Sequence, residues 1–261
     1  MKRKNSLRWL TLFSIGLFLY SSVSLGEFVK ESLHNKRTLM EAQELYGKSQ
    51  NLSSLSRTEN EENTAKPNSA GQVERTPSLM SLVEINEDIV GWISLDQTPI
   101  HYPVLQTVDN EYYLDKDYKR EESKAGSIFM DYRNNMSQAN RHIILYGHRM
   151  KDGSMFASLT NYLDEDFLNI QPRFVFHTLS KSYEAHIFSV YVTTTEFYYI
   201  QTDFENDQHF SFFLQELQKR SLFHPDVSVT SDDLLLTLST CDYTLDAVEG
   251  RLVVHAKLVP F

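Results

Sequence analysis

The sequence has only one cysteine, Cys241, among 261 residues. One cysteine excludes an intrachain disulfide framework, and an unpaired thiol in an exported protein is open to oxidation and to unwanted disulfides. Most free cysteines are small buried hydrophobic residues. An exported chain that keeps a single thiol nevertheless needs a reason to keep it.

The sequence also has few positive charges for its length and no cluster of them beyond its first residues. Four of its 25 Lys and Arg residues lie within the first eight positions, so the remainder carries 21 positive and 35 negative charges, a net charge of −14. Nucleic-acid binding requires clustered cations, so this function class is excluded. No His, Cys and carboxylate group has the spacing of a metal site, and we expect neither a metal nor a cofactor.

An uncharged apolar run from Trp9 to Gly26 follows the four basic residues. This pattern predicts a single membrane span (9–26) behind a cytoplasmic basic tail (1–8), with the rest of the chain outside the cell. A cleaved signal peptide is the alternative, because the run is short and ends in small residues.

The next fifty residues, 27–76, differ in composition between their two halves. Phe28 to Tyr46 is rich in helix formers and predicts a helix. Gly47 to Arg75 has almost no large apolar residues, which predicts a flexible spacer. The main folded domain is therefore expected over 77–261, beginning with a short helix after Thr76 and Pro77.

Short runs of β-branched and aromatic residues fill the folded domain and predict a mainly β structure, a closed barrel or a sandwich. They include IVGWISL, HIILYGH, RFVFHTL, LLLTLSTC and RLVVHAKLV. One segment, Glu205 to Arg220, instead places apolar residues at helical spacing. It predicts a helical insertion before the strand that carries the cysteine.

The strand LLLTLSTC ends at Cys241 and has two different faces. Alternation along a strand puts three leucines, at positions 234, 236 and 238, on one face, which we expect in the core. Thr237, Ser239 and Cys241 share the other face, which we expect to line a groove.

A nucleophilic cysteine needs a proton donor and acceptor, and acyl transfer also needs a group that holds the oxyanion. His148 is the best-placed histidine, because it follows the apolar run IILYG and opens a loop. Arg251 opens a strand ten residues after Cys241 and could supply the fixed donors. His255 lies on the same face of that strand and is the second candidate histidine.

Three motifs together resemble those of the sortases: TLSTC at Thr237 to Cys241, YGH at Tyr146 to His148, and EGRLVV at Glu249 to Val254. The resemblance extends from about Leu79 to Val259 and is closest to class B. It implies a closed eight-stranded sortase β-barrel with N-terminal helices, tethered to the membrane of a Gram-positive cell. It also implies a cysteine transpeptidase that cleaves a sorting motif after threonine, with Cys241 as nucleophile, His148 as acid and base, and Arg251 at the oxyanion.

The resemblance further implies a substrate groove and two partners, a sorting-signal peptide and an amine acceptor. The residues that resemble peptide-binding positions are Asn110, Leu114, Thr195, Tyr199, Ile200 and Ser239. The acceptor is left open between a cell-wall precursor, a pilin lysine and a haem-uptake system. The alternative from another class is a membrane-tethered binding module with an inert cysteine.

Overall fold

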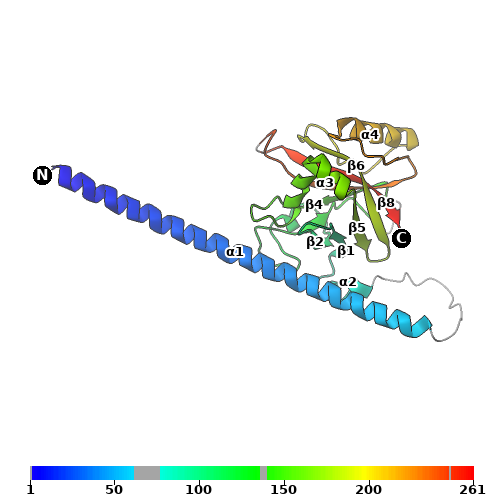
Figure 1. Cartoon of the computed structure of the whole chain (residues 1–261), viewed down its shortest axis with the longest axis horizontal. Helices are drawn as coiled ribbons and strands as arrows, with labels where there is room; N and C mark the ends of the chain where they lie inside the picture. Colours follow the sequence, from blue (N-terminus) through cyan, green and yellow to red (C-terminus); the bar gives the residue numbers. More distant parts are fainter. Residues whose placement is uncertain (1, 62–76, 136–139, 247) are drawn as a thin grey trace. The chain divides into compact units, whose positions relative to one another are not determined.

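The computed structural model describes residues 2–61, 77–135, 140–246 and 248–261 (Figure 1). The chain divides into two compact units, Met1–Met40 and Glu41–Phe261. The first unit is helical, and the second contains the end of the long helix α1 (Lys2–Glu61) and all the strands.

The apolar part of α1 is exposed on all sides among the described residues. Leu12, Phe13 and Phe18 are 62%, 67% and 71% exposed. The helix is long and apolar enough to cross a membrane, a property that an anchor shares with a signal sequence.

Helix α1 continues as far as Glu61, so the first part of the segment 47–75, which was expected to be a spacer, is helical. Its helix-forming Lys, Gln, Leu and Arg residues and the absence of proline before Pro67 favour this. The pair of Glu44 and Lys48, 2.7 Å apart at i,i+4 spacing, adds a small stabilisation. The remaining spacer, 62–76, lies outside the described residues.

Residues 41–49 of α1 belong to the second unit and pack on the barrel. Ala42 and Tyr46 are buried, and the ring of Tyr46 stacks on Trp92 with centroids 4.1 Å apart. Gln43 donates a hydrogen bond to the carbonyl of His101. The short helix α2 (Pro77–Val83) adds Leu79 and Leu82 to the same apolar cluster.

Eight strands close into a barrel in the order β1-β2-β3-β4-β7-β8-β6-β5, which confirms the predicted fold class. They are β1 (Ile89–Ser94), β2 (His101–Leu105), β3 (Ile128–Met130), β4 (His142–Tyr146), β5 (Arg173–Thr178), β6 (Ser182–Thr193), β7 (Leu234–Cys241) and β8 (Arg251–Pro260). The pairs β2–β3 and β4–β7 are parallel, and the other pairs are antiparallel.

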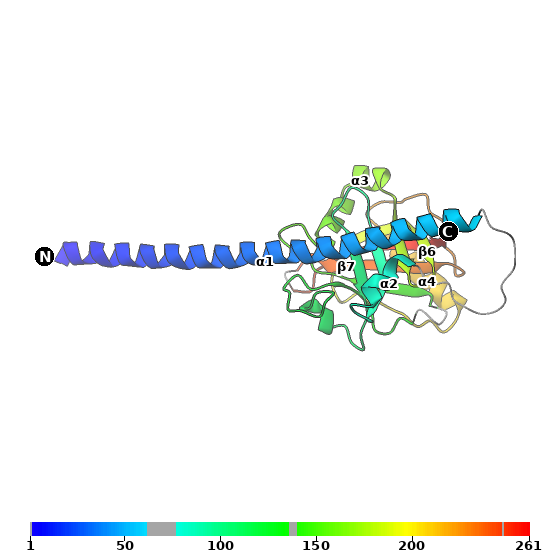
Figure 2. The same ribbon diagram turned by 90° about the horizontal axis from the view of Figure 1, so that it is seen from below.

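The predicted helical insertion is α4 (Asp207–Arg220), which lies beside β6 in both views (Figure 1, Figure 2). The side chain of Asn206 caps its first turn by accepting from the backbone N–H of His209. Its buried face consists of Phe210, Phe213, Leu214 and Leu217. Three shorter helices, η1 (Tyr112–Leu114), η2 (Phe156–Leu163) and α3 (Glu165–Ile170), complete the described connections.

Thr237 of β7 was expected to line a groove but is buried. Leu235, on the same strand face as Thr237, packs in the cluster with α4, and Thr237 itself is fully buried. The Thr237 hydroxyl lies 2.5 Å from His142 Nε2 and 2.6 Å from His255 Nδ1. The groove prediction is therefore wrong for Thr237, because its hydroxyl lies between the buried histidines His142 and His255.

Candidate active site

Strand register brings the three predicted catalytic residues to one end of the barrel. In the parallel pair β4–β7, Tyr146 lies opposite Ser239, so His148 follows its strand at the level where Cys241 ends β7. In the antiparallel pair β7–β8, Cys241 lies directly opposite Arg251. Backbone pairing alone therefore makes neighbours of residues that are far apart in sequence.

Two glycines of the motifs permit this close approach. A Cβ on Gly147 would lie 2.4 Å from the end of the Ile128 side chain and 2.9 Å from the Phe156 ring, so a larger residue would force these side chains to shift. A Cβ on Gly250 would lie 1.9 Å from the carbonyl oxygen of Asp242. The backbones at Asp242 and Gly250 are this close because the N–H of Asp242 donates a hydrogen bond to the carbonyl of Gly250, where β7 ends and β8 begins.

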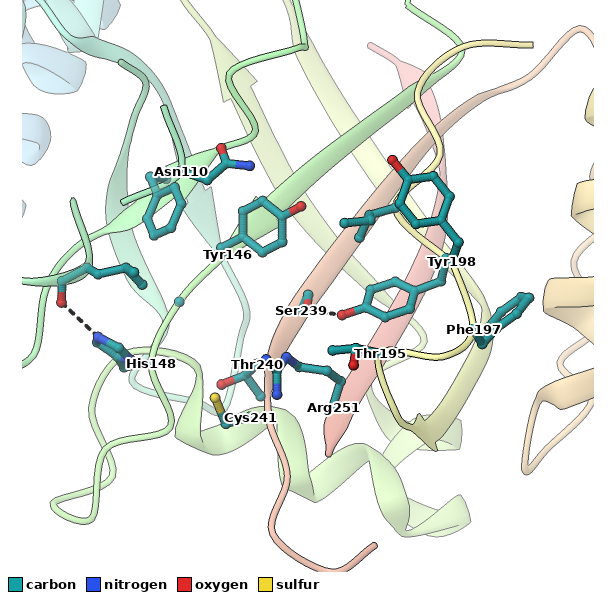
Figure 3. Close-up of a pocket in the computed structure, with 15 residues that line it drawn as sticks. Asn110, Tyr146, His148, Thr195, Phe197, Tyr198, Ser239, Thr240, Cys241 and Arg251 are labelled. Carbon is teal, nitrogen blue, oxygen red and sulfur yellow. Dashed lines mark hydrogen bonds between the residues drawn. The ribbon is translucent and has the colours of Figure 1, made fainter. Parts of the chain in front are cut away.

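The side chains of His148 and Arg251 have defined hydrogen-bond partners, and Figure 3 draws the hydrogen bond of His148. His148 donates its Nε2–H to the carbonyl of Leu114 at 2.7 Å, which leaves Nδ1 as the nitrogen that can exchange a proton. Arg251 directs Nη1 to the carbonyls of Val248 and Gly250, each at 2.9 Å. Cys241 is a free thiol of intermediate exposure.

All nine residues predicted for the site line one pocket of about 330 Å³: Asn110, Leu114, His148, Thr195, Tyr199, Ile200, Ser239, Cys241 and Arg251. The structure brings them together from five segments, and their individual roles stay predictions. Figure 3 places Cys241 at one end of this pocket and Asn110 and Tyr198 toward the other.

Several of the predicted peptide-binding side chains are held in place by protein contacts. Ser239 is buried and shares a hydrogen bond of 2.8 Å with the hydroxyl of Tyr199. Burial raises the pKa of Tyr199, so this hydroxyl stays protonated at neutral pH. Thr195 donates to Glu249 at 3.1 Å, which joins the segment after β6 to the segment before β8.

The pocket has further lining residues that the sequence did not indicate. They are Phe129, Tyr146, Gly147, Phe197, Tyr198 and Thr240. Tyr146 and Gly147 belong to the YGH motif, and Tyr198 is next to a predicted residue. The YGH motif could therefore have indicated Tyr146 and Gly147, and the YYI run could have indicated Tyr198.

His255, the second candidate histidine, is not part of the pocket. It is fully buried, its Nδ1–H donates to Thr237, and its Nε2 accepts from the hydroxyl of Tyr191 at 2.7 Å. Burial lowers its pKa well below the usual value, so it is a neutral core residue. This leaves His148 as the pocket histidine.

A model of the sortase domain matches residues 93–259. A sortase B from Listeria monocytogenes is 42% identical over 260 residues, covering 99% of each chain. The chain belongs to the sortase family, class B.

Solved structures agree with this assignment. The sortase is similar to a Staphylococcus aureus sortase B–substrate complex, with TM-score 0.76, 37% identity, 88% coverage of this chain and 99% of the other. It is also similar to a sortase B complexed with triglycine, with TM-score 0.75, 38% identity, 88% coverage of this chain and 99% of the other. Membership of class B makes the sortase a cysteine transpeptidase, which the sequence predicted.

Proposed function

We propose that this transpeptidase cleaves a sorting motif after its threonine and transfers the acyl part from Cys241 to an amine. The observation that carries the proposal is the pocket that joins a free thiol, a histidine and an arginine at the register-paired ends of three strands. The family supports an enzyme over a binding module with an inert cysteine.

In the first half of the reaction, Nδ1 of His148 takes the proton of the Cys241 thiol, and the sulfur attacks the threonine carbonyl carbon. The oxyanion then lies near Arg251, whose Nη1 is held by two backbone carbonyls, so that Nε and Nη2 remain to donate. When the peptide C–N bond breaks, the leaving amine takes a proton from His148. The products are a thioester on Cys241 and the released C-terminal peptide.

In the second half, the acceptor amine attacks the thioester carbonyl, and His148 removes one proton from that amine. Collapse of the tetrahedral intermediate forms the new amide and releases the sulfur of Cys241, which takes the proton back from His148. Nδ1 of His148 is the atom proposed to hold the proton, because the Leu114 carbonyl already accepts from Nε2–H.

The peptide is proposed to lie along the pocket away from Cys241, against Asn110, Leu114, Thr195, Tyr199, Ile200 and Ser239. The acceptor is proposed to be the amine of a cell-wall cross-bridge, with a pilin lysine as the second candidate. The triglycine bound by a similar sortase B favours the cross-bridge, because the amine of triglycine is the N-terminus of a short peptide and not a lysine side chain.

The proposed location is the outer face of the cell membrane, with α1 retained as the anchor. The exposed apolar side chains of α1 and the basic residues before them support this orientation. Mass spectrometry of the protein from membranes tests it, since a cleaved signal peptide would leave a chain that begins near residue 27.

The activity is tested with the full-length chain in detergent micelles. The substrates are a pool of synthetic peptides, each with one threonine in randomised flanks, and the acceptors are triglycine and an Nα-blocked lysine. Mass spectrometry should find products joined through threonine to triglycine. Cys241→Ser, a change of similar size, should give none; equal turnover by this variant would contradict the proposal.

A further inference from the structure

The two walls of the pocket come from distant parts of the chain. One wall contains Asn110 and Leu114, between β2 and β3, and the other contains 195–200, between β6 and α4. At the end away from Cys241, Asn110 and Tyr198 come from opposite walls (Figure 3). Two residues that do not line the pocket, Asp131 and Arg133, connect them.

Asp131 is a fully buried carboxylate that contacts Asn110 of one wall and Tyr146, which also lines the pocket. Its Oδ2 accepts from Asn110 Nδ2 at 3.1 Å and from the hydroxyl of Tyr146 at 2.8 Å. Its other partner is Arg133, which donates Nε to Oδ1 at 2.8 Å and Nη2 to Oδ2 at 2.6 Å. Burial alone would raise the pKa of Asp131, but the hydrogen bonds from Arg133 and Tyr146 hold it below its usual value.

Arg133 continues the connection to the opposite wall. Its Nη1 donates to the hydroxyl of Tyr198 at 2.6 Å, and its Nη2 donates to the carbonyl of Ile200 at 3.0 Å. One guanidinium therefore holds the buried carboxylate and two residues of the wall at 195–200. Only the planar, branched geometry of arginine allows this, and lysine could not make the same set of bonds.

A purely structural role does not account for this arrangement. Burying an ion pair costs desolvation energy that apolar side chains of similar volume would avoid. The side chains of the pair form hydrogen bonds with Asn110, Tyr146, Tyr198 and Ile200, all of which line the pocket. Arg133 also lies over the ring of Tyr132, 6.0 Å from its centroid. These hydrogen bonds therefore hold residues of both pocket walls in position.

We propose that Arg133, held by Asp131, is a positioning residue that fixes the separation of the two pocket walls and thereby the affinity for the peptide. This inference rests on the proposed function of the pocket. Arg133 takes no part in the chemistry at Cys241, which lies at the other end. Its loss therefore affects binding and not the chemical steps.

The test uses the full-length chain in detergent micelles with Arg133→Met and Arg133→Lys. Arg173→Met is the matched control, because Arg173 lies on β5, is 56% exposed and pairs only loosely with Glu184, at 3.5 Å. The probe is the peptide that wild type ligates fastest to triglycine. A methanethiosulfonate reagent separately measures the reactivity of Cys241.

Arg133→Met is expected to raise KM about tenfold, while kcat and the labelling rate of Cys241 change less than about twofold. The KM of Arg133→Lys should lie between those of wild type and Arg133→Met, and the KM of Arg173→Met should equal that of wild type. An unchanged KM, a fall in kcat alone, or the same rise in Arg173→Met overturns the inference. Absence of ligation by wild type overturns the proposed function, and this inference with it.

A second measurement covers the case in which Arg133→Met does not fold. Tyr198→Phe removes the hydroxyl that accepts from Arg133 and is combined with Arg133→Lys in a double-mutant cycle. If Arg133 acts through the wall, the effects of the two changes on KM are less than multiplicative. Fully multiplicative effects would overturn the inference.

Discussion

Arg149 and Asp242 form an ion pair of 2.8 Å, and each directly follows a proposed catalytic residue, His148 or Cys241. Asp242 is fully buried, and it also accepts from the backbone N–H of Thr244. The pair therefore ties the loop that begins at His148 to the end of β7.

Arg149→Met is expected to lower kcat about tenfold or more with little change in KM. Loss of the tie lets His148 move relative to Cys241, and small displacements of reacting groups are costly. Steady-state kinetics on the full-length chain measures the two constants. A variant that is less stable but has unchanged kcat would show that the pair is only structural.

Arg251→Lys is expected to lower kcat about 100-fold or more, although the charge is kept. Lysine cannot both bond the carbonyls of Val248 and Gly250 and direct separate donors to an oxyanion. Single-turnover measurement of the thioester on Cys241 checks the first half of the reaction. Normal thioester formation in this variant would assign Arg251 a different role.

The buried histidine His142 predicts a loss of stability in acid. Its Nδ1–H donates to the carbonyl of Gln201 and its Nε2 accepts from Thr237, an arrangement that needs the neutral ring. Burial lowers its pKa from 6.5 to about 4. The unfolded chain thus binds a proton that the folded chain does not, and stability present above pH 6.5 is lost as the pH falls toward 4.

This loss is on the order of 3 kcal/mol over that interval, from about 1.4 kcal/mol per unit of pKa. Denaturant unfolding at a series of pH values measures it. His142→Gln keeps polar atoms without a titrating ring, so its stability should depend less steeply on pH. An equally steep dependence in the variant would assign the effect to other groups.

Tyr46→Ala is expected to destabilise the second unit by roughly 3 kcal/mol, because it removes a large buried ring that stacks on Trp92. Thermal unfolding of the full-length chain measures the loss. Lys48→Ala is the control on the same helix, since its side chain is 67% exposed. Equal melting temperatures for the two variants would mean that this part of α1 is not needed for stability.

The sequence predicted the barrel and the catalytic end because these depend on local patterns. Alternation in β7, the position of His148 after an apolar run and the motif order are all visible without coordinates. The role of Thr237 was not predictable in this way. Its burial depends on His142 and His255 from the strands on either side of β7, whereas Ser239 and Cys241 reach the pocket.

The Asp131 and Arg133 pair was missed for a similar reason. Charged residues after a short strand are typical of a solvated loop. Only the closed barrel brings them next to Tyr198 and Ile200, more than sixty residues away. In α1, the composition after Gly47 indicated a spacer, although no proline occurs before Pro67 and the helix continues to Glu61.

The parallel pairing of β4 with β7 has an evolutionary consequence. The segment between β6 and β7, which includes the wall at 195–200 and α4, contributes no strand to this pair or to the rest of the barrel. Its length and composition can change without moving the backbone hydrogen bonds that align His148 with Cys241. New peptide preferences can therefore arise in this connection while the chemistry is inherited unchanged.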